Sequence, residues 1–276
     1  MKNIPIPTIH LFPVLEEQLI QLLHSLKAEE WNRPTIARLW TVKDVAAHLL
    51  DGNIRVLSMV RDNYTGDAPG NIFSNEDLVG YLNGLNADWV KAMKRVSPQA
   101  LTALLEITGK QYCQQLALLD PFAPAIFAVS WAGETNSINW FHIAREYTER
   151  WHHQQQIRDA VGKPAIMTRE LYHPVLDTFM MALPYTYRNT EAKENTVIKI
   201  SVSGEAGGDW FIIKKENWEL VKTNNLPVTA HTIINGDIAW KLFTKSWRRK
   251  EVMEYVSMEG DAVLGAPVLD MIAVMA

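Results

Sequence analysis

The segment 138–161 holds the densest group of side chains that could do chemistry. Its apolar and polar residues repeat with a helical period, so we expect one long helix here. At about 100° per residue, one narrow stripe of that helix carries two imidazoles and two carboxylates, those of His142, Glu146, Glu149 and His153. One divalent cation accepts imidazole nitrogen and carboxylate oxygen together. Glu149 and His153 stand at i and i+4, so both can reach a single ion from one helix face.

The direction in which this stripe faces decides what it does. On a solvent-facing stripe the side chains would form ordinary surface pairs, and a buried His–Glu hydrogen bond is a further interpretation. On a core-facing stripe they need partners, because an unpaired buried charge is very costly. A metal ion would be such a partner. His152 lies roughly 80° to one side of the stripe.

A second histidine, on a different expected helix, helps to decide between a metal site and the other interpretations. His48 lies among apolar residues at helical spacing, including Val45, Leu49 and Val56. A lone histidine on an apolar face is more often a hydrogen-bonded core residue than a ligand. Two inward polar clusters on separate helices have a joint explanation, however, because helical bundles build metal sites from side chains on facing helices.

Residues 1–190 are expected to form the helical domain that positions these side chains. Apolar spacing and breakers predict helices over 11–28, 41–62, 74–96, from 97 onward, 138–161 and 168–187. Thr41 with Asp44 fits a helix N-cap, as does Ser74. Gly162 followed by Pro164 would end the helix 138–161.

The periodicity of apolar residues changes after the polar run 188–195, which we interpret as a linker. Period-two alternation predicts strands at 196–202 and 210–214, with further strands at 227–233 and 252–258. A helix should follow Asn235, and another should close the chain over 261–275. The expected fold class is therefore α+β with two domains, residues 1–190 and 191–276.

Composition limits the function. The chain has 276 residues, 47% hydrophobic and 21% charged, with a net charge of −4. This balance supports a sizeable core and argues against nucleic acid as the partner. The start has no apolar signal core, no stretch could span a membrane, and Cys113 has no cysteine partner. We expect a cytoplasmic monomer or homodimer acting on a small molecule, without membrane or nucleic-acid partners.

Two segments resemble a known family. Residues 40–49, WTVKDVAAHL, resemble the "W-x-V-x-D-v-x-x-H-l" segment of the mycothiol-dependent maleylpyruvate isomerase family, which belongs to the DinB-like helical-bundle metalloproteins. Residues 149–157, ERWHHQQQI, are similar to its "E-x-x-x-H-x-x-D-i" signature. The resemblance covers about residues 10–165. It implies a DinB-like four-helix bundle, followed by a small sterol-carrier-like α/β domain whose last helix would begin at Asp261.

The resemblance also implies roles for individual residues. It assigns metal-ligand roles to His48, Glu149 and His153 rather than His152, ordinarily for zinc with water completing the shell. Gln156 departs from the family, which often has aspartate there. The family's C-terminal arginine is thought to bind a substrate carboxylate, and Arg248 and Arg249 are the candidates here.

Three functions stay open at this point. Three ligands leave coordination positions free, as in catalytic zinc sites, although His and Glu ligands do not separate zinc from nickel or iron. The resemblance implies a low-molecular-weight thiol used for isomerisation or S-transfer to a small electrophile. A metal-dependent hydrolase with Glu146 as general base is the alternative. The third is a non-catalytic metal-binding module of the stress response.

Overall fold

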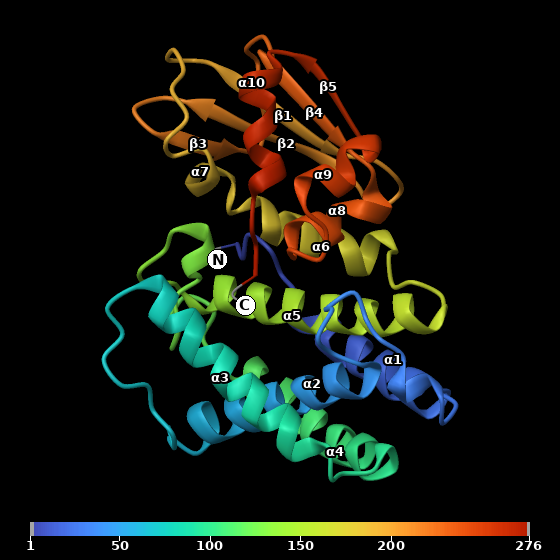
Figure 1. Ribbon diagram of the computed structural model, residues 1–276. Coiled ribbons are helices and arrows are strands. Elements are labelled where there is room, and N and C mark those ends of the chain that lie inside the picture. The colour runs from blue at the N-terminus through green and yellow to red at the C-terminus, as the bar shows by residue number, and fades with distance from the viewer. Residues whose placement is uncertain (1–2, 275–276) are drawn as a thin grey trace.

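The computed structural model, which describes residues 3–274, has a helical half and a half built on one mixed sheet (Figure 1). This is the expected α+β fold. Helices α1 (Phe12–His24), α2 (Val42–Val56), α4 (Pro98–Ala117) and α5 (Asn139–Val161) form the bundle, and α3 (Asn75–Met93) packs on α2. No helix among the described residues is both long and apolar enough to cross a membrane.

Local sequence sets where these helices begin and end. Thr41 and Asp44 form a capping box at the start of α2, and Ser74 begins α3 in the same way. Helix α2 runs into one π-helical turn, Leu57–Arg61. Gly162 ends α5 in the left-handed conformation, with φ of 66°. The predicted starts of α2 and α3 and the predicted end of α5 are confirmed.

The sheet has the strand order β3-β2-β1-β4-β5. Central β1 (Val197–Val202) pairs parallel with β4 (Ala230–Ile234) and antiparallel with β2 (Gly208–Lys214). Strands β3 (Trp218–Val221) and β5 (Val256–Gly260) form the two edges, both antiparallel to their neighbours. Alternate residues of the central strands, such as Ile198, Ile200 and Ile212, are fully buried on one face.

Helix α6 (Arg169–Met180) packs on α5 and also contacts the sheet half. On one side, Tyr172 stacks on Trp151 of α5 at 4.5 Å between ring centroids. On the other side, Asp177 accepts a hydrogen bond from Trp210 of β2 at 2.8 Å. One apolar core therefore runs from α5 through α6 to the sheet. The division at residues 190 and 191 stays a prediction.

Short helices lie before and between the strands of the sheet half and after them. They are α7 (Leu183–Thr186), α8 (Gly236–Phe243), α9 (Arg249–Val252), α10 (Ala262–Gly265) and the 3-10 helices η5 (Met253–Tyr255) and η6 (Ala266–Asp270). The helical half has three further 3-10 helices, η1 (Ile9–Leu11), η2 (Glu30–Asn32) and η4 (Ser130–Ala132). Helix α8 begins at Asn235, whose side chain accepts from the Asp237 N–H, as expected. The termini of the described chain lie close to the bundle in Figure 1.

Three predictions of elements were wrong. The closing helix over 261–275 is instead α10 and η6, because Pro267 opens a new 3-10 turn and the chain leaves helical geometry at Met271; residue 275 lies outside the described residues. The expected helix 168–187 divides at Met181 and Ala182. The strand predicted at 252–258 begins only at Val256, because Val252 ends α9 and Met253–Tyr255 form a 3-10 turn. In addition, strand β3 was not predicted, since its four residues give too short an alternation.

Candidate metal centre

His48, Glu149 and His153 meet where α2 faces α5. The ring centroids of the two histidines are 4.6 Å apart at an interplanar angle of 72°. Glu149 Oε2 lies 3.5 Å from His153 Nε2. All three line a cavity of about 40 Å³, which has room for one ion and a small group such as water. The structure thus brings together the three residues to which the resemblance assigned metal-ligand roles.

The orientation of His153 is fixed by its neighbour on the helix. Its Nδ1 lies 2.9 Å from Gln156 Oε1. An amide oxygen only accepts hydrogen bonds, so Nδ1 carries a proton, and Nε2 is the nitrogen that faces Glu149. Metal-ligating histidines are held by such outer contacts. Gln156 therefore supplies, with an amide oxygen, the contact that its departure from the family pattern had put in doubt.

His48 has the properties of a neutral imidazole ligand. Burial lowers the pKa of His48 well below its usual value, and the charge of nearby His153 lowers it further. Its Nδ1 is buried and has no hydrogen-bond partner among the described residues. Trp40 lies against its ring, with centroids 4.9 Å apart. His48 lines the cavity, and an uncharged imidazole with an unpartnered nitrogen fits a metal ligand.

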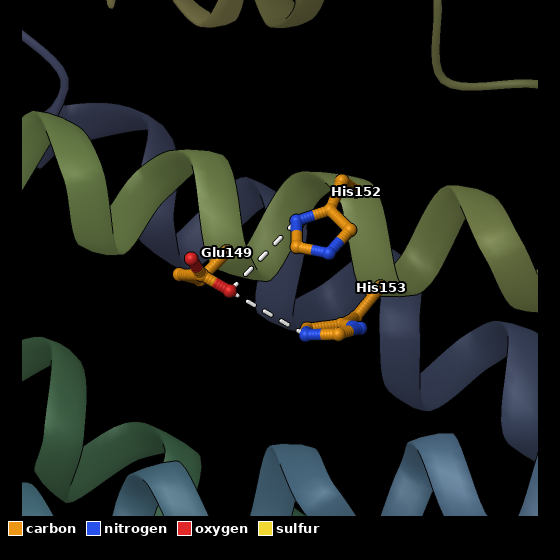
Figure 2. Close-up of side chains that lie close together, drawn as sticks. All are labelled: Glu149, His152 and His153. Carbon is orange, nitrogen blue, oxygen red and sulfur yellow. Dashed lines mark ion pairs between the residues drawn. The ribbon is translucent and has the colours of Figure 1, made fainter. Parts of the chain in front are cut away.

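Glu149 is an ionised carboxylate. Burial alone would raise its pKa, but the hydrogen bond with His153 and the charges of His152 and His153 hold the pKa well below the usual range. Its Oε2 faces both imidazole rings, 3.9 Å from His152 Nδ1 and 3.5 Å from His153 Nε2 (Figure 2). Glu149 is therefore in the charge state that metal coordination requires.

His152 is closer to this group than its position on the helical wheel suggests. Its ring centroid is 3.9 Å from that of His153, and ligand atoms of Glu149, His152 and His153 lie within 4.8 Å of one another. However, His152 Nδ1 is 3.0 Å from the Thr148 carbonyl, to which it donates. Burial and His153 lower the pKa of His152 to about 3. Two ligand sets are thus geometrically possible, and they share Glu149 and His153.

A charged network backs the cavity. Arg150 is buried, 3.3 Å from Glu16 Oε2 of α1, and its guanidinium lies 4.3 Å above the Tyr112 ring. It also donates to Asn53 of α2. The network joins all four bundle helices behind the candidate ligands, and Arg150 and Tyr112 line the cavity directly.

Gly109 of α4 makes space for this network. A Cβ atom at Gly109 would stand 1.8 Å from Glu16 Oε1. Only glycine allows the Glu16 carboxylate to approach the α4 backbone so closely. No pattern in the sequence signals this contact, because the two residues lie far apart in the chain.

Glu146, the predicted catalytic residue of α5, lines the same cavity. Tyr112 donates to its Oε2 at 2.8 Å and Arg145 to its Oε1 at 2.5 Å. Burial would raise the pKa of Glu146, but Arg145, His142 and the Tyr112 hydroxyl together lower it. Both oxygens are therefore engaged, and the carboxylate is a weaker base than a free glutamate.

Arg248 and Arg249 do not line this cavity. Arg248 precedes α9, where its backbone N–H donates to Glu251, and Arg249 pairs with Asp270 at 3.3 Å. Sequence reasoning missed three residues beside the candidate ligands, namely Trp40, Tyr112 and Arg150. Trp40 stands inside the quoted motif, whereas nothing in the sequence around Tyr112 indicates its place at the cavity.

Comparison with known proteins agrees with this architecture. The family model described as the mycothiol maleylpyruvate isomerase N-terminal domain matches residues 12–158, more than half of the chain. This chain therefore belongs to the mycothiol-dependent maleylpyruvate isomerase family.

Two solved structures share the fold across both halves. They are a mycothiol-dependent maleylpyruvate isomerase and a mutant of such an isomerase, with TM-scores of 0.56 and 0.55. Each is 12% identical, and each alignment covers 95% of this chain and 98% of the other. At this identity the likeness shows the fold. No curated protein sequence matches the chain.

Proposed function

We propose that this protein binds one divalent metal ion, zinc as the family resemblance implies, through His48, Glu149 and His153. The observation that carries the proposal is the meeting of a neutral, unpartnered imidazole on α2 with an imidazole–carboxylate pair on α5 around a cavity of ion size. The His152 nitrogen that faces Glu149 is Nδ1, and this nitrogen donates to the Thr148 carbonyl, which favours His48 as the third ligand.

We further propose thiol-dependent isomerisation or S-transfer to a small electrophile. A bound divalent ion with open positions would lower the pKa of a coordinating thiol, giving thiolate at neutral pH. The residues of this chain orient and protect that position. Gln156 holds the His153 tautomer, Trp40 lies against His48, and the network of Arg150 and Glu16 fixes α5 relative to α1.

Elemental analysis of protein purified without a His-tag tests the metal site. About one metal per chain is expected in the wild type, with loss in His48→Ala and in His153→Ala. His152→Ala is the matched control and should keep the metal. If His152→Ala loses it while His48→Ala keeps it, the ligand set is Glu149, His152 and His153. A wild type that takes up no metal after reconstitution contradicts the proposal.

The hydrolase alternative makes a different prediction. There Glu146 would remove a proton from water, yet both of its oxygens accept hydrogen bonds and its pKa is lowered. The metal-loaded protein should therefore bind a low-molecular-weight thiol, detected by a spectral shift after cobalt substitution, and should leave activated esters intact. Rapid ester hydrolysis that Glu146→Gln abolishes, with no thiol binding, would favour the hydrolase.

A further inference from the structure

The structure has a second, far larger hollow away from the candidate metal centre. It has a volume of about 1160 Å³, against about 40 Å³ for the metal cavity, and the two share no lining residue. Its walls come from the start of α3, the segment around Trp131, α7, α10 and η6, and from Lys245 and Arg249. Ligand pockets for small organic molecules have volumes of this order. We call it the interdomain groove.

Lys245 is the distinctive charge of the groove. It is half-buried, and burial together with the charge of Arg248 lowers its pKa. Among the described residues, no carboxylate lies within ion-pair distance of Lys245, whereas neighbouring Arg249 is neutralised by Asp270 at 3.3 Å. A half-buried cation without a counter-charge is complementary to an anionic ligand.

The backbone of Lys245 is strained as well. Its φ is 59°, in the left-handed region that L-residues with long side chains rarely adopt. Such a conformation has a cost and persists where the surrounding structure imposes it. Glycine would fit this position without strain, so the lysine side chain is kept here against the local preference of the backbone.

The rest of the wall is mixed: the carboxylates of Glu76, Glu134 and Asp270 line it, together with apolar residues that suit an apolar body. Val79, Val263, Pro267 and Ile272 contribute aliphatic surface. Tyr185 also lines the groove, and the Arg188 guanidinium lies over its ring, 3.8 Å from the centroid. Gly133, with φ of 83°, lets Tyr185 pack closely, since a Cβ there would lie 2.4 Å from the Tyr185 ring.

We propose that the interdomain groove binds a small organic anion, in which an apolar body lies along the aliphatic wall and a carboxylate or sulfonate pairs with Lys245. This site is separate from the metal centre and does not depend on the function proposed for it.

Fluorescence titration with the anionic probe 8-anilinonaphthalene-1-sulfonate tests the proposal. One site per chain is expected, with the Kd raised about tenfold in Lys245→Met, the effect of losing one charge-assisted contact. Lys250→Met, at an exposed lysine that does not line the groove, is the matched control and should bind as the wild type does. The uncharged analogue N-phenyl-1-naphthylamine should bind more weakly and equally to all three proteins.

Two further measurements separate this site from folding and from the metal centre. Lys245→Gly should lose probe affinity as Lys245→Met does while its Tm stays at or above the wild-type value, because the backbone strain is relieved. Removal of metal with a chelator should leave the Kd unchanged. Equal affinity of the wild type and Lys245→Met, or loss of the probe on chelation, would overturn the proposal.

Discussion

The interiors of the two halves of this protein are built from different chemistry. Inside the bundle, α5 buries polar residues along much of its length, among them His142, Arg150, His152, His153 and Gln156. The core between α6 and the sheet is almost wholly apolar, with Phe179, Phe243, Ile198, Ile200 and Ile212 fully buried. Burying apolar area stabilises a fold by about 25 cal/mol per Å², whereas buried polar groups at best offset their desolvation cost. The sheet half and a second apolar cluster between α1, α2 and α4 thus contribute stability, while α5 keeps a polar interior for the site.

The buried ion pair gives the largest test of this contrast. Glu16→Ala leaves Arg150 uncompensated and should lower the free energy of unfolding by about 3–5 kcal/mol, measured by urea denaturation. Glu17→Ala, one residue away on the exposed side, should change it by less than about 0.5 kcal/mol. Replacing both partners, Glu16→Met with Arg150→Met, should recover most of the loss. A double variant as unstable as Glu16→Ala would mean that the pair stabilises the fold.

Acid should destabilise the bundle through protonation of buried His142. Burial, and then the charge of Arg145, lowers the pKa of His142 from 6.5 to about 4 in the folded state. Because the unfolded chain binds the proton more readily, stability from this residue is present above pH 6.5 and is lost as the pH falls toward 4. The loss should reach about 3 kcal/mol.

Chemical denaturation of the metal-free protein at several pH values measures this loss. His142→Asn keeps an acceptor for Arg145 but cannot be protonated, so its stability should fall less between pH 6.5 and 4. The same slope in both proteins would remove His142 as the source.

Gly109 distinguishes a glycine kept for packing from one that is only tolerated. Gly109→Ala forces a Cβ into Glu16 and should cost about 1–3 kcal/mol in thermal or urea unfolding. Gly84 lies in exposed α3 with nothing within 4 Å of a Cβ, so Gly84→Ala should stabilise by about 0.5–1 kcal/mol. Equal effects at the two positions would show that Glu16 moves aside without cost.

Sequence reasoning predicted the features of this protein that local chemistry decides. Thr41 and Ser74 mark helix starts because their hydroxyls satisfy nearby backbone N–H groups. The stripe on α5 follows from helical spacing alone. Features that depend on distant contacts escaped prediction: Tyr112 reaches Glu146 across the bundle, and Glu16 meets Gly109 through the missing side chain of a glycine.

The C-terminal arginines also show that a residue's type does not tell where the fold places it. Arg248 and Arg249 were assigned to catalysis by resemblance, and their positive charge suited a carboxylate. Their place is set by the packing of α9, which directs Arg249 to Asp270 and the interdomain groove rather than to the metal cavity. Residue type indicated the chemistry, but only the tertiary fold decides which site a side chain joins.

The contact between Gln156 and His153 gives the most local test, because its effect should be confined to the metal site. Gln156→Ala removes the acceptor of the Nδ1 proton, so the ring can rotate and the other tautomer becomes accessible. Metal affinity, measured by competition with a chelating dye, should fall about 10–100-fold while the fold is retained. Gln156→Glu should bind metal at least as tightly as the wild type, because a carboxylate is a stronger acceptor than an amide.

The matched control is Gln154→Ala, since Gln154 is also buried on α5 but does not line the cavity. Equal losses of metal affinity in Gln154→Ala and Gln156→Ala would mean that any truncation of a buried α5 side chain disturbs the site. The effect would then come from packing rather than from the orientation of His153.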